Sequence, residues 1–350
     1  MATVNLHKNY KQPLVQAFEY SSVLAGKSTT EYSWRGNEAI VLTDINTESL
    51  NDYNRGLSSN RYGTPTEVTD NQQILTLQKD RSFAKIVDKG NYQEQNYLKT
   101  GAAVIKAYMN EQVSPEMERF YFHEVAHNAG KILTTSAKPT ASNILAEVLK
   151  LETALDEARA PKDGRYVAMP HEYVALIRQS LTNLDNVTDK WLIKGVVGKI
   201  GTMNVIGVAS ADMPQGAHLV AWQKKAVANP KTIEDAKVSK DVPGVSGILI
   251  EGRFRYGVFV VGKRSGAVVA MVDAAKKCTT PTITKGETTS TIAAGTGETI
   301  YYTVDGTDPR YSNSAKAYSA AITNLAAGGV IRAVAKADGK FASDLAEQIF

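Results

Sequence analysis

Cysteine is almost absent from this sequence, because Cys278 is the only one among 350 residues. A single thiol excludes an internal disulfide framework, which small secreted domains use to stabilise a minimal core. We therefore expect the protein to assemble in a reducing compartment, with Cys278 as a buried or linker thiol.

Long apolar runs are missing as well. Residues 1–25 lack the continuous apolar core of a secretory signal, and no segment reaches the roughly 20 apolar residues that a membrane helix needs. A large excess of one charge is also missing, because the net charge is only +4. Composition therefore indicates neither export, nor membrane residence, nor a dedicated nucleic-acid binder. What is present, 43% apolar and 22% charged residues, is typical of a globular chain with two domains or several lobes.

The segment from Asn143 to Ile177 predicts a helix, a turn, a strand and a second helix in close succession. The apolar residues that recur at helical spacing are Ile144, Leu145, Val148, Leu151 and Leu155. Pro161 ends this helix, residues 162–164 supply turn chemistry, and residues 165–169 form a β-branched and aromatic run. Pro170 then begins the second helix.

Residues 31–88 predict a long hairpin. One strand-like flank contains Ile40, Leu42 and Ile45, and the other runs from Gln72 to Asp88. The polar stretch between them, residues 54–71, is too long for a tight turn, and such a loop usually is mobile or finds its partner on another chain. The alternative is a plain surface hairpin.

Residues 93–130 predict a long helical region that is broken once, because Ser114-Pro115-Glu116 has the composition of a helix start. The alternative is a pair of ordinary core helices.

Further along, residues 195–208 interleave glycines with β-branched residues, which favours strands with turns. The G-x-G-x-x-G order of a dinucleotide-binding site is absent. Residues 218–227 and 252–261 are predicted to pair and close a sheet.

The composition changes near Lys276. Residues 276–281 read as a linker into a module of about 70 residues rich in Thr, Ala, Gly and Val. Within this module we expect a strand over Ile300–Val304, a reversal at Asp305-Gly306 and a partner strand over Val330–Ala335.

One motif argues for an enzyme. His123, Glu124 and His127 spell H-E-x-x-H, the zinc-protease signature. The third ligand of that pattern would fall at Leu133, and neither Glu147 nor Glu152 has the context of an alternative ligand. We therefore interpret the pentad as coincidental and predict no catalytic residue, no metal site and no cofactor. His7, His171 and His218 are scattered singly.

Four stretches resemble known families. Residues 155–165, LDEARAPKDGR, resemble the axial domain of the major capsid proteins of tailed phages, the Johnson fold. The run SNRYGTPTE at residues 59–67 is similar to a loop of phage coat proteins, and Gly198, Ile200, Gly201 and Ser210 fit a further pattern of that family. The C-terminal motif of Tyr302, Thr303, Asp305, Gly306, Asp308 and Pro309 resembles the small immunoglobulin-like sandwiches of chitobiase-type hexosaminidases.

The capsid resemblance implies an α+β chain organised as follows: an N-terminal arm (1–30), an extended hairpin (31–90), a spine helix region (91–132), a mainly axial domain (133–228), peripheral-domain strands (229–275), a linker (276–281) and an all-β immunoglobulin-like domain (282–350). It implies a non-enzymatic major capsid protein that self-assembles through hexamers and pentamers into an icosahedral shell around double-stranded DNA. The hairpin loop that would reach a neighbouring subunit contains Asn60, Arg61, Tyr62, Gly63 and Pro65.

The same resemblance implies a location in the virion capsid after assembly in the host bacterial cytoplasm. The expected partners are further copies of the chain, a separate scaffolding protein, a portal protein and packaged DNA, with surface glycans as a partner of an outward-facing C-terminal domain. Isopeptide cross-linking is not expected, because Lys79 and Lys85 lie in the strand flank. The alternative function is a secreted carbohydrate-binding protein or a zinc-dependent hydrolase.

Overall fold

The structure is a computed structural model. It describes residues 22–32, 39–45, 50–68 except 51, 57, 64 and 66, 70–90, 100–182, 198–240, 243–244 and 246–350 except 327. Most of the predicted N-terminal arm, His7 and the predicted helix start at Gln93 lie outside these residues. The described residues form two compact units, one of 22–32 with 76–277 and one of 39–75 with 278–350.

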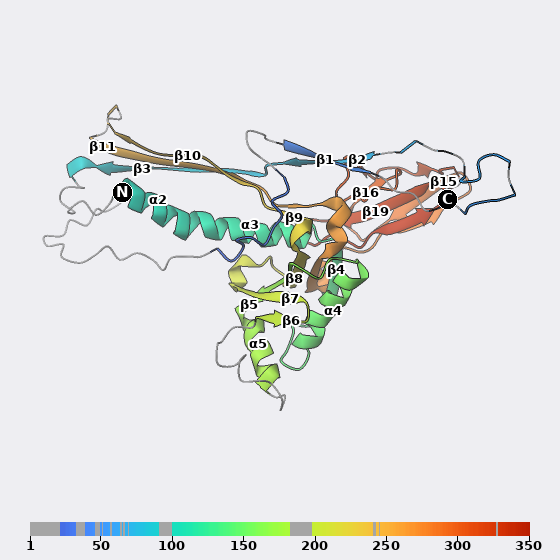
Figure 1. Cartoon of the computed structure of the whole chain (residues 1–350), viewed down its shortest axis with the longest axis horizontal. Helices are drawn as coiled ribbons and strands as arrows, with labels where there is room; N and C mark the ends of the chain where they lie inside the picture. Colours follow the sequence, from blue (N-terminus) through green and yellow to red (C-terminus); the bar gives the residue numbers. More distant parts are fainter. Residues whose placement is uncertain are drawn as a thin grey trace. The chain divides into compact units, whose positions relative to one another are not determined.

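A long helix is the first feature of the larger unit (Figure 1). It consists of α2 (Gly101–Tyr108), a π-helical turn (Met109–Val113) and α3 (Ser114–His127). Thr100 caps its start, because its side chain accepts a hydrogen bond from the amide of Ala103. The predicted start of a second α-helix at Ser114 is confirmed, but the chain stays helical on both sides of it, since Val113 and Ser114 both have helical backbone angles.

Pro115 explains why the sequence suggested a helix start at this point, and the local geometry explains how the chain stays helical. A proline inside a helix has no N–H to donate and its ring crowds the carbonyl four residues earlier, here Glu111. The chain absorbs this conflict by widening one turn, in which the amide of Ser114 donates to the carbonyl of Met109 five residues back. The helix therefore continues through the proline.

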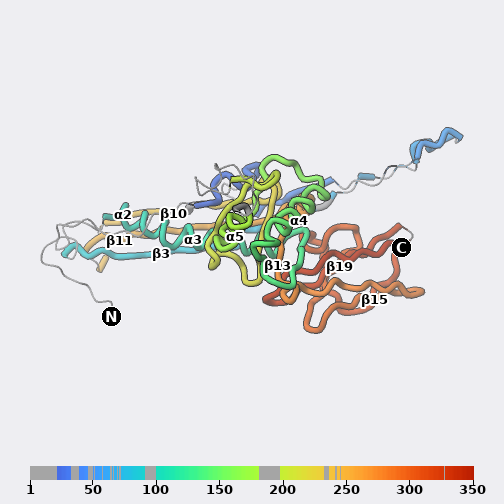
Figure 2. Tube along the Cα trace, turned by 90° about the horizontal axis from the view of Figure 1, so that it is seen from below, coloured from blue at the N-terminus to red at the C-terminus, as the bar shows by residue number. Residues whose placement is uncertain are grey.

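A three-stranded antiparallel sheet runs along this helix, as Figure 1 and Figure 2 both show. Its strands are β3 (Lys79–Asp88), β10 (Lys231–Lys240) and β11 (Gly247–Tyr256), in the order β10-β11-β3. Phe83 of β3 stacks on Tyr108 with ring centroids 4.4 Å apart. Gly252 lies opposite Phe83, and a Cβ at that glycine would come within 2.6 Å of the Phe83 ring. The missing side chain at Gly252 thus makes room for the ring.

The predicted pairing of residues 218–227 with 252–261 is confirmed only at its edge, where Val227 of β9 (Val227–Ala228) pairs with Val260 of β12 (Phe259–Val260). β11 pairs with β10 and β3, whereas β8 (Ala217–Gln223) pairs with β5 (Arg165–Pro170) and β13 (Val268–Asp273). Both predicted segments are amphipathic or apolar, and alternation alone does not say which strand is the neighbour. The apolar run of β13 received no strand assignment of its own from the sequence.

The second sheet of this unit has six strands in the order β4-β13-β8-β5-β7-β6. The strands not yet given are β4 (Lys131–Thr135), β6 (Lys199–Ile200) and β7 (Met203–Val208). β4 is parallel to β13 and β5 is parallel to β7, while the other neighbours are antiparallel. The predicted helix, turn, strand and helix are confirmed as α4 (Ile144–Glu157), β5 and α5 (His171–Thr182).

Trp222 of β8 joins the sheet to the long helix. Its ring is fully buried and lies 5.7 Å from Tyr121 and 6.3 Å from Phe122, both on α3. Its indole Nε1 donates to the carbonyl of Lys27 at 2.9 Å. The sheet, the helix and the segment before residue 32 therefore share one core.

The other unit contains two separate β structures. β1 (Ala39–Ile45) pairs with β2 (Asp70–Thr76), so the predicted flank over residues 72–88 divides into two strands in two sheets, β2 and β3. The C-terminal part has one sheet of β14 (Thr282–Lys285), β15 (Thr289–Ala293) and β18 (Ile322–Thr323). Its other sheet contains β17 (Lys316–Ala317), β16 (Thr299–Thr303), β19 (Val330–Lys336) and β20 (Ala346–Ile349). The predicted pairing of residues 300–304 with 330–335 is confirmed, since β16 and β19 are antiparallel neighbours.

Candidate assembly surfaces

Arg165 is the centre of the 155–165 motif. Its guanidinium is buried at the end of α4 and binds Asp156 at 2.7 Å through Nη2. It also donates to the carbonyls of Ala160 at 2.6 Å and Pro161 at 3.0 Å. The chain can bend back around this side chain because Arg159 and Gly164 both take positive φ angles, of 53° and 68°. The motif thus locks the turn that leads from α4 into β5.

A second contact extends this lock to the turn between β6 and β7. Thr202 accepts a hydrogen bond from Arg165 Nη1 at 3.0 Å and donates its own hydroxyl to Glu152 Oε1 at 2.8 Å. The Thr202 amide also donates to Glu152 Oε1. Gly201 has a φ of 55°, and a Cβ there would lie 2.0 Å from the Glu152 carboxylate. Gly201 of the predicted glycine pattern and the 155–165 motif therefore meet in one polar network, through Thr202 and Glu152.

The tip of the predicted hairpin is a compact loop. The amide of Asn54 donates to the carbonyl of Arg61 at 2.9 Å, and the amide of Gly63 donates to the carbonyl of Asn60 at 2.9 Å. Asn60 and Gly63 supply the positive φ angles, 51° and 95°. Tyr62 packs edge-on against Tyr53 yet remains 82% exposed. The structure thus brings Asn60 to Gly63 together at one exposed tip, with Pro65 just beyond it.

The two-stranded ribbon of β1 and β2, which carries this tip, has little hydrophobic core of its own. Two strands alone are at most marginally stable in water. Several large apolar side chains of the ribbon and its loop are exposed, namely Val41, Ile45, Leu50, Val68 and Ile74. Exposed apolar side chains gathered on one thin element are typical of an interaction surface.

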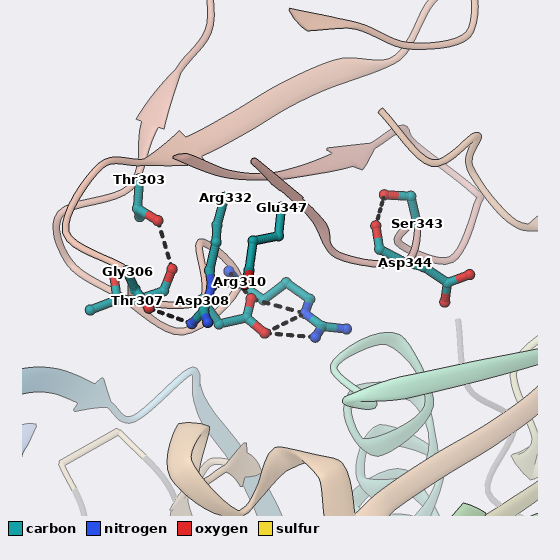
Figure 3. A network of polar contacts seen from close by, with 9 residues as sticks. All are labelled: Thr303, Gly306, Thr307, Asp308, Arg310, Arg332, Ser343, Asp344 and Glu347. Atoms are coloured by element: carbon teal, nitrogen blue, oxygen red, sulfur yellow. Dashed lines mark hydrogen bonds and ion pairs between the residues drawn. The ribbon is translucent and has the colours of Figure 1, made fainter. Parts of the chain in front are cut away.

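The C-terminal motif builds a self-supporting loop, shown in Figure 3. The Thr303 hydroxyl donates to the carbonyl of Thr307 at 2.6 Å, and the Thr307 amide donates to Asp305 Oδ1 at 3.0 Å. Hydrogen bonds from Thr307 and Ser314 lower the pKa of Asp305 against the opposing effect of burial, which is the largest single influence. The motif residues therefore fix the loop between β16 and β17.

Asp308 holds the other half of this loop. Its carboxylate accepts from Arg310 Nε and Nη2, the latter at 2.6 Å, and the guanidinium is almost fully buried. Gly306 has a φ of 74°, and its carbonyl accepts from Arg332 of β19. The ring of Tyr302 packs on the core of the two sheets, whose buried members are Ile292, Ile300, Ile331 and Ala333. These motif residues therefore hold the loop and the two sheets together.

The H-E-x-x-H residues lie near the C-terminal end of α3. Nδ1 of His127 donates to the carbonyl of His123 at 2.9 Å, and the two imidazole rings stack with centroids 4.1 Å apart. The Glu124 carboxylate accepts from Asn128 at 3.0 Å and from Gln78 at 3.3 Å. Burial lowers the pKa of His127, and the hydrogen bond to the carbonyl of His123 opposes that effect in part. Within the part of the chain that the structure describes, no group of three or more His, Cys, Asp or Glu side chains is arranged to hold a metal ion.

One polar cluster was not anticipated. His218 is buried between Tyr173, whose hydroxyl lies 2.7 Å from Nδ1, and Asp273, whose Oδ1 lies 2.8 Å from Nε2. Burial, with the charges of Glu172 and Asp273, raises the pKa of Tyr173 to about 12. The partners are 45 and 55 residues away from His218 in sequence, so no local pattern could have revealed them.

None of the helices in the described residues combines the length and hydrophobicity that a membrane span requires. A comparison with curated proteins gives no match. The family described as "Fn3 associated" matches residues 290–350, which include β16, β19 and the whole C-terminal motif. This match agrees with an immunoglobulin-like domain at the C-terminus.

Solved phage structures share the fold. The structure of Mycobacterium phage Che8 matches with a TM-score of 0.62 at 20% identity, covering 77% of this chain and 98% of the other. The capsid of cyanophage P-SCSP1u matches with a TM-score of 0.61 at 12% identity, covering 77% and 93%. The mature capsid of bacteriophage PhiM1 matches with a TM-score of 0.57 at 13% identity, covering 77% and 92%. Over about three quarters of its length, the chain therefore has the Johnson fold of phage capsid proteins, and it carries an immunoglobulin-like β domain at its C-terminus.

Proposed function

We propose that this chain is a major capsid protein that self-assembles into an icosahedral shell around double-stranded phage DNA. The observation that carries this proposal is the match to phage capsid structures, which covers more than nine tenths of each of those chains and 77% of this one. A shell is built from repeated weak contacts between copies, so its formation requires complementary surfaces rather than a catalytic group.

The hairpin tip supports a specific contact. Asn60, Arg61, Tyr62, Gly63 and Pro65 form the proposed assembly loop, which would lie on a neighbouring copy. A preformed loop loses little conformational entropy on docking, and the internal hydrogen bonds of this tip supply that preorganisation. A largely exposed tyrosine is a residue type enriched at interface centres.

The assembly loop is tested by Tyr62→Ala in the full chain, followed by electron microscopy and light scattering. We expect fewer or no closed particles at a concentration where the original chain forms them, and an unchanged denaturation midpoint. Ser59→Ala in the same loop is the matched control and should assemble normally. Equal assembly by both variants would exclude the tip as a contact.

We further propose that the C-terminal domain decorates the outside of the shell, where weak binding to surface glycans would gain from repetition. The domain boundaries proposed from the sequence, with the linker at residues 276–281, place this module after the shell-forming part. Gold labelling of a tag at the C-terminus of intact particles tests the outward position. Particles lacking residues 281–350 that adsorb to cell surfaces as well as complete ones would exclude the glycan role.

The remaining elements of the proposal concern partners and chemistry. We propose a separate scaffolding protein and a portal protein as assembly partners in the bacterial cytoplasm. We also propose that the chain is not an enzyme, since Glu124 is engaged by Asn128 and Gln78 on the surface of α3. A secreted zinc hydrolase or carbohydrate-binding protein is the weaker alternative, because the capsid-like part of the chain would have no role in it.

A further inference from the structure

One end of the six-stranded sheet gathers basic side chains. β8 ends there at Gln223, opposite Arg165 at the start of β5, and Val268 begins β13 opposite Trp222. Three short connections lie at this end: the turn of residues 161–164, the 3-10 turn η3 (Lys224–Ala226) and the 3-10 turn η4 (Gly262–Ala267). The side chains that define this basic end are Arg159, Lys162, Lys224, Lys225, Lys263 and Arg264.

The three connections are fixed to one another. The amide of Lys224 donates to the carbonyl of Gly164 at 2.8 Å, and Arg264 Nη1 donates to the carbonyl of Lys225 at 2.9 Å. A Cβ at Gly266 would lie 3.3 Å from the Cβ of Ala158, which places η4 beside the end of α4. The basic side chains therefore project from a rigid base rather than from separate loops.

Nearby carboxylates offset only part of this positive charge. Glu31 accepts from Arg264 at 2.8 Å and lies 3.9 Å from the ammonium of Lys225, whose side chain is 64% exposed. Asp163 and Glu157 are the other acidic residues on these segments. Since the whole chain has a net charge of only +4, this end is a local concentration of positive charge.

The surroundings of these cations select the kind of partner. Protein partners are usually held by buried aromatic or aliphatic anchors at the centre of an interface. Among the described residues, no exposed large apolar side chain lies in segments 158–165, 223–226 or 261–267. Lysine and arginine without apolar anchors suit a phosphodiester backbone, whose contacts carry no sequence information.

We propose that the basic end binds the phosphates of double-stranded DNA without sequence specificity. This inference rests on the proposed function and names the surface of the chain that would contact packaged DNA. The exposed lysines Lys225 and Lys263, together with the half-buried Lys224, would neutralise phosphates. Arg264 would act mainly in holding η3, through Glu31 and the carbonyl of Lys225.

The test compares two triple variants of the full chain with equal changes in net charge. The first, Lys224→Glu, Lys225→Glu and Lys263→Glu, reverses the basic end. The control, Lys89→Glu, Lys138→Glu and Lys316→Glu, reverses exposed lysines elsewhere. Binding to a mixed-sequence DNA duplex is measured by fluorescence anisotropy across a salt series. Each lost phosphate contact should reduce the slope of log K against log salt by about 0.9, so we expect a reduction of about 2 to 3 for the first variant and less than about 1 for the control.

Two results of the binding experiment would overturn this inference. One is an equal loss of DNA binding in both variants. The other is displacement of the DNA by polyglutamate of the same charge at equal or lower concentration, which would assign the basic end to an acidic protein partner instead. Electron microscopy of the same samples separates this inference from the proposed function. If the first variant forms shells that retain less DNA, both the shell-forming function and DNA binding by the basic end are supported. If its shells retain the same amount of DNA, only DNA binding by the basic end is overturned.

Discussion

At the scale of single residues, the buried guanidinium of Arg165 is the most consequential side chain in the shell-like part of the chain. It satisfies Asp156, Thr202 and two carbonyls that would otherwise lack donors at the end of α4. Removing the guanidinium leaves the two carbonyls at the end of α4 without this donor, whereas Asp156, whose side chain is 47% exposed, stays in contact with water.

Arg165→Met should therefore lower the free energy of unfolding by about 1 to 3 kcal/mol, measured by urea denaturation of the unassembled chain. Lys162→Met, in the exposed turn just before it, is the matched control and should change stability by less than about 0.5 kcal/mol. Indistinguishable midpoints for the two variants would refute the role assigned to the network.

Tyr173 gives a prediction about pH. Its pKa is raised to about 12 in the folded chain, above the value near 10 of an unfolded tyrosine. The raised pKa means that this contribution to stability is complete below about pH 10 and is lost as the pH rises toward 12. Tyr173→Phe should flatten the decline in urea midpoint between pH 10 and 12, after a loss of about 1 kcal/mol at pH 8 from the missing hydrogen bond to His218. A Tyr173→Phe chain whose urea midpoint falls between pH 10 and 12 as steeply as that of the original chain would contradict this account.

His123 and His127 lead to a negative prediction. The purified chain should contain far less than one zinc per molecule, and His123→Ala should leave assembly intact, because these rings stack on each other at the helix surface. Elemental analysis of metal content and particle counting provide the readouts. Stoichiometric zinc that disappears in His123→Ala would restore the hydrolase interpretation.

At the scale of elements, the sheet along the long helix depends on a glycine. Gly252→Val places side-chain atoms where the Phe83 ring lies and should push that ring away from Tyr108. Overpacking of this kind typically costs about 1 to 3 kcal/mol, which urea denaturation would detect. Gly198→Ala is the control, because no atom lies within 4 Å of a Cβ there. A Gly252→Val chain as stable as the control would show that the close approach is not needed.

The elements also show which sequence patterns were informative. The helix, turn, strand and helix of residues 143–177 could be predicted because helical spacing, Pro161 and the turn residues all agree locally. The continuous long helix could not, since Pro115 is tolerated only through a π-helical turn that sets no sequence signature. The pairing of β8 with β13 depends on strand order in the six-stranded sheet. The residue pattern of a strand indicates which face is buried but not which strand is its neighbour.

At the scale of the whole molecule, three short motifs were enough to predict the fold, because each is tied to a structural constraint. LDEARAPKDGR encloses a buried arginine, and Gly201 of the glycine pattern meets the same network. The C-terminal motif closes a loop between two strands. The His218 cluster and the basic end escaped prediction, because both are assembled from segments distant in sequence.

The proposal that this chain forms shells is tested most directly by electron microscopy of the purified full chain over a concentration series. Contacts that close upon one another make assembly steeply concentration-dependent, so we expect monomers at low concentration and rings, tubes or closed shells above a threshold. A correctly folded chain that remains monomeric from micromolar to millimolar concentration, both alone and together with its scaffolding protein, would contradict the account.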